Sequence, residues 1–175
     1  MVRCFEAIFP EEKVIKKSIE VLRLIDSLPM KTKLVEPENL HISLSFLGEK
    51  TDNEIQKIVN KLEIIAEGFH SFEVEFNGIE FIPNKSFIRV LAVKVKSFDG
   101  EVLRNKIVSS VGGSSYPLHL TLARVKNVSN KNKVVESLSS INISEKSIVK
   151  SFYLVKSQLT KKGPVYTPIK EFKLD

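Results

Sequence analysis

The chain has 175 residues, of which 42% are hydrophobic, and a formal net charge of +6. This length can bury a core as one domain or as two small fused lobes. No apolar run approaches the roughly 20 residues of a membrane-spanning helix, and the first residues lack the layout of a signal peptide. Cys4 is the single cysteine, so the chain can form neither an internal disulfide nor a cysteine-based metal site. We therefore expect a cytoplasmic globular protein with Cys4 buried in its first strand. The charge favours an anionic partner such as nucleic acid, although a solvated lysine-rich surface explains it equally well.

Hydrophobic periodicity predicts alternating strands and helices in both halves of the chain. In the first half we expect a strand at 4–9, a helix at 11–28, an extended piece at 33–36, a strand at 40–47, a helix from 51 to about 68 and a strand at 72–82 with a turn or bulge at 77–78. In the second half we expect a strand at 87–95, a helix from about 99 to 111, a strand at 118–125, a helix at 130–140, one or two strands within 143–156 and a strand at 165–174. A capping box opens the second helix, with Thr51 followed three residues later by Glu54. We interpret the Gly-Gly-Ser-Ser segment at 112–115 as a flexible connector.

One short motif occurs twice. Residues 41–44 read His-Ile-Ser-Leu and residues 119–122 read His-Leu-Thr-Leu, and both copies follow a leucine. A single His-x-Ser in a strand is most often a structural histidine, but two matching copies in a chain with three histidines favour a shared function. The third histidine, His70, has no hydroxyl partner, so we expect it on the surface. The repeat also suggests that the chain arose by duplication.

The alternation of side chains along a strand gives each motif one polar and one apolar face. His41 and Ser43 share the polar face of the first motif strand, and His119 and Thr121 share that of the second. If the two strands lie side by side, these four groups meet in one cleft. Two imidazoles, with an ordinary pKa near 6.5, can act as a general acid and a general base, while the hydroxyls donate hydrogen bonds to phosphate oxygens. The motifs contain no carboxylate or cysteine, so they favour attack on phosphorus without a metal ion.

The segments 39–49 and 117–124 resemble the two signature motifs of the 2H phosphoesterase superfamily, and more narrowly those of the RNA 2′,3′-cyclic phosphodiesterases, also called 2′-5′ RNA ligases. Residues 3–8, 89–91 and 154–166 are similar to the same family, so the resemblance covers nearly the whole chain. The family usually has threonine where Ser43 stands, and serine keeps the hydroxyl donor. The resemblance implies an α+β, bilobal, duplicated fold with pseudo-two-fold symmetry, in which two antiparallel sheets with outer helices surround a central groove. Residues 1–175 would then form a single domain of two intertwined lobes, each carrying one motif.

The resemblance also implies the reaction. It is hydrolysis of RNA 2′,3′-cyclic phosphate ends to 2′-phosphates without a metal ion or cofactor, with His41 as proton donor and His119 as proton acceptor. Spacing alone does not decide which histidine is the acid. Reversible 2′-5′ joining of tRNA halves is a further activity to test. We expect a monomer that binds RNA and no membrane. Two alternatives remain open: a non-catalytic RNA-binding module, and a phosphodiesterase that acts on small cyclic nucleotides.

Arg124 stands where the family has an arginine linked to phosphate binding. A regular strand would turn Arg124 to the leucine face, so either the strand bulges or ends near Ala123, or Arg124 is a surface charge. We favour the first interpretation, because a guanidinium suits a phosphate site. The matching position in the first motif is Phe46, which we interpret as a core residue. Arg3 and Tyr166 either border the groove or are an ordinary surface arginine and a half-buried aromatic residue.

Overall fold

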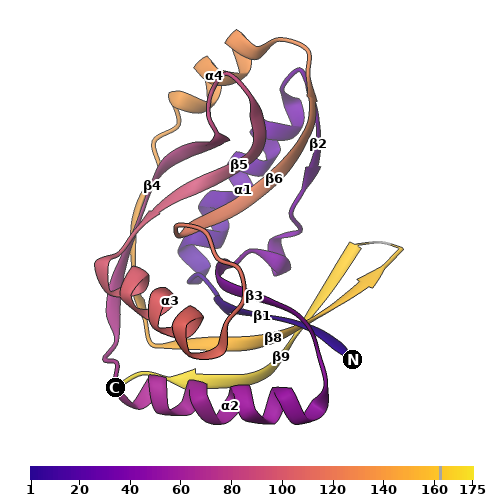
Figure 1. Cartoon of the computed structure of the whole chain (residues 1–175). Coiled ribbons are helices and arrows are strands. Elements are labelled where there is room, and N and C mark those ends of the chain that lie inside the picture. The colour runs from indigo at the N-terminus through magenta and orange to yellow at the C-terminus, as the bar shows by residue number, and fades with distance from the viewer. Residues whose placement is uncertain (162) are drawn as a thin grey trace.

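The computed structural model describes residues 1–161 and 163–175 (Figure 1). Strands and helices alternate along most of the chain, in the order β1 (Val2–Ile8), α1 (Glu12–Ser27), β2 (Met30–Leu34), the short 3-10 helix η1 (Pro37–Asn39), β3 (Ile42–Lys50), α2 (Asp52–Glu67), β4 (Phe72–Pro83), β5 (Ile88–Lys96), α3 (Phe98–Val111), β6 (His119–Val128), α4 (Lys131–Ser139), β7 (Ser144–Val149), β8 (Ser151–Thr160) and β9 (Gly163–Lys173). The expected element types are confirmed, and the region 143–156 contains two strands.

The described strands form one antiparallel sheet in the order β7-β4-β5-β6-β3-β1-β8-β9, with β2 paired to β6 outside this path. The α+β class is thus confirmed, whereas the two sheets that we expected are one continuous sheet. Its two parts meet at a narrow junction, because β3 and β6 pair only through Ile42 and Leu120. The other neighbouring strands pair along much of their lengths. The two motif strands are therefore the strands that join the two parts of the sheet.

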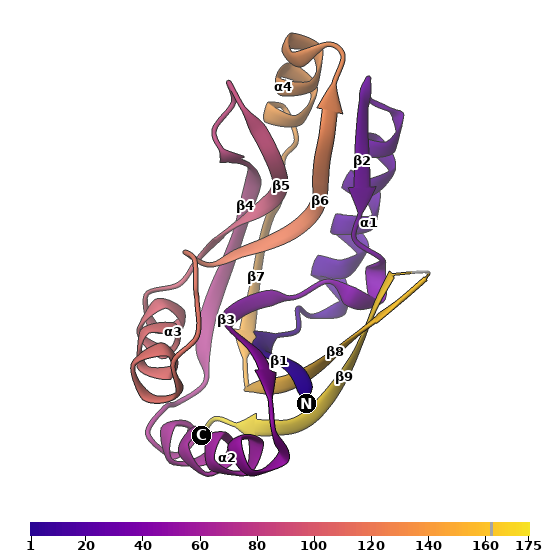
Figure 2. The same ribbon diagram turned by 45° about the vertical axis from the view of Figure 1, so that its right-hand side comes forward.

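Helices α1 and α4 pack on one part of the sheet and α2 packs on the other, whereas α3 contacts strands of both parts (Figures 1 and 2). Helix α1 packs on β2 and β6, and α4 packs on β4. Helix α3 packs on β3 and β4, and α2 packs on α3 and β9. Among the described residues, no helix is long and apolar enough to cross a membrane.

The apolar faces of the motif strands lie in the main core. The two residues of this face in each motif have no exposed surface: Ile42, Leu44, Leu120 and Leu122. Full burial of such a side chain stabilises the fold by about 1.5–3 kcal/mol. The polar residues of the motifs remain partly exposed. Packing on one face thus fixes both strands and leaves their opposite faces for chemistry. Cys4 is buried, as expected.

The connector between α3 and β6, which we interpreted as flexible, is bound to β3 by hydrogen bonds. Phe46 N donates to Ser114 O at 2.8 Å, and Ser114 N donates to Phe46 O at 3.0 Å. Ser45 Oγ also donates to Gly112 O at 3.0 Å. Gly113 lies against β3 with φ +96°, and a Cβ there would stand 2.8 Å from Phe46 O. Only glycine allows this close crossing of the motif strand.

The capping box at the start of α2 is present as predicted. Thr51 N donates to Glu54 Oε2 at 2.8 Å, and Glu54 N donates to Thr51 Oγ1 at 3.3 Å. These two bonds satisfy backbone donors that have no partner within the helix. They set the direction in which the chain leaves β3.

Candidate active site

The junction of β3 and β6 brings the two motifs together. Ile42 and Leu120 face each other across the antiparallel pair. The residues on either side of such a pair also face each other, with Cβ atoms about 5 Å apart in a regular ladder. Continued by one residue on each side, this register sets His41 opposite Thr121 and His119 opposite Ser43. His41, Ser43 and Thr121 line one hollow at the junction, and His119 is near enough to act electrostatically on His41.

Both imidazoles are held by the same backbone contact. His41 Nδ1 lies 2.7 Å from Asn39 O, and His119 Nδ1 lies 2.8 Å from Pro117 O. A carbonyl oxygen can only accept a hydrogen bond, so Nδ1 carries a proton in both rings. Nε2 is then the nitrogen that gains or loses a proton in each histidine. The two motifs thus present equivalent nitrogens for proton transfer.

His41 stands in an aromatic setting. The Phe5 ring centroid lies 4.9 Å from that of His41, and the Tyr166 ring meets His41 edge-on with centroids 5.2 Å apart. Burial lowers the pKa of His41 below its ordinary value of 6.5, and the charge of His119 lowers it further. The bond to Asn39 O acts in the opposite direction. In the unliganded protein at neutral pH, the His41 imidazole is therefore mainly neutral.

A matching bulge follows each motif. In β6, Thr121 pairs with Ala92 and Ala123 pairs with Leu91, which leaves Leu122 as the extra residue. In β3, Ser43 pairs with Ala7 and Ser45 pairs with Glu6, which leaves Leu44 as the extra residue. An extra residue reverses the facing of the side chains that follow it. The bulge that we favoured near Arg124 is therefore present, and β3 contains its counterpart.

The two bulges turn Arg124 and Phe46 toward the polar side of the junction. A hollow of about 160 Å³ is lined by both of them together with His41, Ser43 and Thr121. Phe46 is 41% exposed, so its interpretation as a core residue is wrong. The physical reason is the bulge at Leu44, which no pattern of apolar residues indicated. Arg124 thus reaches the same hollow as three of the four motif groups.

A wider hollow of about 590 Å³ adjoins the first and contains two residues whose position the sequence left open. Arg3 and Tyr166 both line it, so they border the groove. Lys33 lines both hollows and pairs with Arg124 across β2 and β6. Sequence reasoning missed Lys33, because β2 is short and its pairing with the far end of β6 is non-local. The only local sign of a role for Lys33 was the presence of a lysine in a short extended segment.

Residues outside the motifs hold the segments that precede the histidines. On the second motif, Leu118 N donates to Glu101 Oε1 at 2.9 Å, and Glu101 Oε2 accepts from Arg104 Nε at 2.6 Å. On the first motif, Asn39 Nδ2 donates to Pro164 O at 3.0 Å. Helix α3 and strand β9 thereby fix the backbone from which each imidazole extends.

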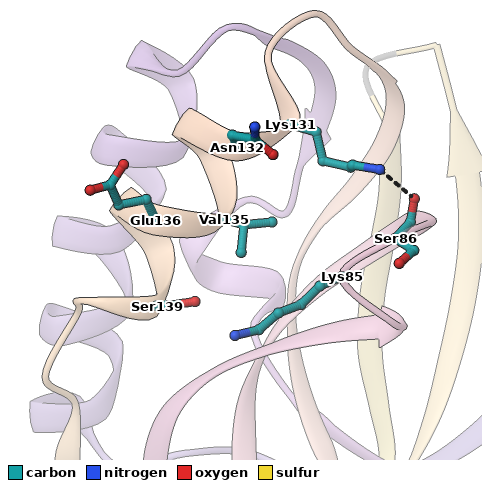
Figure 3. Close-up of a pocket in the computed structure, with 7 residues that line it drawn as sticks. All are labelled: Lys85, Ser86, Lys131, Asn132, Val135, Glu136 and Ser139. Carbon is teal, nitrogen blue, oxygen red and sulfur yellow. Dashed lines mark hydrogen bonds between the residues drawn. The ribbon is translucent and has the colours of Figure 1, made fainter.

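Another hollow, of about 450 Å³, lies between α4 and the β4–β5 turn (Figure 3). Lys131 Nζ donates to Ser86 O at its edge at 3.3 Å. No histidine lines this hollow, so it lacks the acid–base pair of the junction. His70 is exposed, as expected. Within the described ranges, no group of three or more His, Cys, Asp or Glu side chains is arranged to hold a metal ion.

Comparisons with known proteins show the family of the chain. Residues 8–92 match the family described as LigT-like phosphoesterase. The RNA 2′,3′-cyclic phosphodiesterase of Methanothermobacter thermautotrophicus is 30% identical to this chain, over 99% of both chains. That of Archaeoglobus fulgidus is 32% identical, over 97% of this chain and 99% of the relative. TT0787 of Thermus thermophilus superposes with a TM-score of 0.86 at 26% identity, over 98% of this chain and 97% of that one. E. coli LigT complexed with 3′-AMP shares the fold, with a TM-score of 0.75 at 21% identity over 99% and 98% of the two chains. The chain therefore belongs to the RNA 2′,3′-cyclic phosphodiesterases, a family of LigT-like 2H phosphoesterases.

Proposed function

We propose that the protein hydrolyses the 2′,3′-cyclic phosphate ends of RNA to 2′-phosphates, using its own side chains without a metal ion or cofactor. The observation that supports this proposal is the pairing of Ile42 with Leu120, because this register, continued by one residue on each side, would bring each motif histidine opposite the hydroxyl of the other motif. The curated relatives that span the whole chain are named for this activity. A strand junction with two equivalent Nε2 atoms suits one proton donation and one proton acceptance at a single phosphorus.

In the proposed reaction, water attacks the phosphorus and the bond from phosphorus to the 3′ oxygen breaks. His119 Nε2 takes a proton from the attacking water, and His41 Nε2 gives a proton to the departing 3′ oxygen. The bond to the 2′ oxygen remains, so the products are a 2′-phosphate and a 3′-hydroxyl. Ser43 and Thr121 donate hydrogen bonds to the non-bridging oxygens, and Arg124 supplies a guanidinium that can bind two of them.

In the free protein, the lowered pKa of His41 does not favour its proposed role as proton donor. Burial lowers the pKa of His41, which favours the neutral imidazole and hence the role of base. A cyclic phosphate carries a negative charge, and an anion beside an imidazole favours its protonated form. We therefore infer that substrate binding protonates His41 and prepares it as the donor. The reversed assignment is the competing mechanism.

A substrate with sulfur in place of the 3′ oxygen separates the two mechanisms. A thiol has an ordinary pKa near 8.5, so a thiolate departs without a donated proton. We expect His41→Ala and His119→Ala each to lower kcat by about 10²–10⁴-fold on the oxygen substrate. The sulfur substrate should restore turnover to His41→Ala and leave His119→Ala impaired. Rescue of His119→Ala instead would reverse the assignment.

Two further measurements test the reaction class. Full activity in EDTA is expected, because no proposed step uses a metal ion. Phosphorus NMR of the product should show a 2′-phosphate. Wild-type turnover in both histidine variants would overturn the proposed chemistry. No turnover by the wild-type protein, together with an affinity for RNA that survives both substitutions, would favour the RNA-binding module.

We further infer that the same site can join RNA ends. If the 5′-hydroxyl of another RNA replaces water, the same displacement forms a 2′-5′ phosphodiester and frees the 3′-hydroxyl. This requires the two ends of a nick, such as tRNA halves, to meet in the groove. Because one chain supplies both motifs, the site needs no second copy, and we infer that the monomer is active.

A further inference from the structure

The catalytic hollow continues into the wider one. Five residues line both: Lys33, Phe46, Arg124, Pro164 and Tyr166. From this shared border, the wider hollow extends over β1 to Arg3 and along β8 to Leu159. A ligand that fills the catalytic hollow can therefore extend into the wider one without leaving the surface. We call the two together the groove.

Among the described residues, the wider part of the groove is lined by cations and by no acidic side chain. Arg3, Lys33 and Arg124 line it, and none of them forms an ion pair with another described residue. Glu49 faces Arg3 in the β1–β3 register but does not line the hollow. Unneutralised charges of one sign in a concave surface concentrate the field there and attract a ligand of the opposite sign.

The cations are spread along the groove and do not gather at one point. Lys33 and Arg124 face each other across β2 and β6 at the catalytic end. Arg3 stands on β1, where its register partner in β8 is Ser157, itself the partner of Tyr166 in β9. A lone phosphate at the histidines would leave Arg3 without a partner. A ligand with phosphates in sequence would use both ends of the groove.

We propose that the wider part of the groove binds the RNA strand on the 5′ side of the cyclic end, with Lys33 and Arg3 contacting its phosphodiesters. This inference rests on the proposed function and narrows its substrate to oligonucleotides. The groove contact is to the backbone, so it selects for strand length and carries no sequence preference. Cyclic mononucleotides have no internucleotide phosphodiester, so they cannot use the contact.

The test compares a 2′,3′-cyclic mononucleotide with a trinucleotide that ends in a 2′,3′-cyclic phosphate. We expect the wild-type protein to have a higher kcat/KM for the trinucleotide. Arg3→Ala and Lys33→Ala should each lower the ratio of the two kcat/KM values by about fivefold to tenfold. Each should also make the dependence of log kcat/KM on log salt concentration shallower for the trinucleotide, by about 0.7 per lost phosphate contact.

Matched controls remove the same charge outside the groove. Lys31→Ala changes an exposed lysine of the same strand as Lys33, and Arg23→Ala changes an exposed arginine of α1. Neither lines the groove, so neither should change the substrate ratio. Urea unfolding of every variant reports on its folding independently of turnover.

The outcomes separate the two proposals. A substrate ratio that stays at the wild-type value in both Arg3→Ala and Lys33→Ala would overturn the strand contact and leave the hydrolysis standing. Equal loss on both substrates would also overturn it, because it would assign these residues to the reacting phosphate. Failure of the wild-type protein to open either substrate would overturn the proposed function itself.

Discussion

Replacement of Glu6 by glutamine tests how the sheet accommodates a buried acid beside the first motif strand. Glu6 lies in β1 opposite Ser45 of β3 and has no exposed surface. Neither carboxyl oxygen meets the distance and angle of a hydrogen bond with a described residue, although the backbone of Glu6 and the Ser45 side chain lie close enough to oppose part of the rise in pKa. Burial raises the pKa of Glu6 from 4.5 to about 8. At neutral pH the folded protein therefore holds this carboxyl protonated, whereas the unfolded chain ionises it.

The size and sign of the change in the free energy of unfolding with pH follow from the difference between the folded-state and unfolded-state pKa of Glu6. A raised pKa means that the folded state binds the proton more tightly. The associated stability is fully present below pH 4.5 and is lost as pH rises through about 8. Each pH unit in this window lowers the free energy of unfolding by about 1.4 kcal/mol, so the wild-type protein should lose about 3–5 kcal/mol across it. Glu6→Gln removes the titrating group and keeps the size of the side chain.

The assay is urea unfolding at pH 5 and pH 8.5, with the free energy of unfolding measured for both proteins. Other titrating groups are common to both, so the difference between the two proteins isolates Glu6. From pH 5 to pH 8.5, the free energy of unfolding of Glu6→Gln should rise by about 3–5 kcal/mol relative to that of the wild-type protein. Glu67→Gln, at an exposed position of α2, is the control and should follow wild type. Parallel pH dependence of Glu6→Gln and wild type would refute the protonated buried carboxyl.

Two further predictions concern the segments that hold the motifs. Gly113→Ala should lower the free energy of unfolding in urea by about 2–4 kcal/mol, because its Cβ would strike Phe46 O. Gly112 also has a positive φ but has open space around it, so Gly112→Ala should lower the same free energy by about 1–2 kcal/mol. Equal losses in the two variants would contradict the close crossing. Glu101→Ala frees Leu118 N and should lower kcat more than it raises KM, since Glu101 holds the backbone beside His119 and lines neither hollow of the groove. Glu101→Gln keeps one acceptor for Leu118 N and should recover part of kcat, and a loss confined to thermal stability would refute this positioning role.

The expected organisation as one domain of two intertwined lobes stays a prediction. The continuous sheet supports it, because β3 and β6 come from different halves of the chain and pair at the junction. The duplication is likewise an inference from the repeated motif and the order of elements. The monomeric state also stays a prediction.

The sequence by itself determined what depends on neighbours along the chain. The alternation of polar and apolar residues at 41–44 and 119–122 dictates which faces are buried, and the structure has Ile42 and Leu120 fully buried. Thr51 and Glu54 form their capping box within a single turn of chain. These features follow from side-chain periodicity and local hydrogen bonding, so they need no knowledge of the rest of the fold.

Only the tertiary structure decided what depends on pairing between distant strands. Lys33 reaches the groove because β2 pairs with β6, and Phe46 faces the groove because Leu44 is an extra residue in the pairing of β3 with β1. Glu6 has a raised pKa because two strands and the core exclude water from it, although an alternating pattern would allow it a surface position. Strand register and bulges are set by the competition of all pairings in the sheet, and that competition is invisible to local sequence patterns.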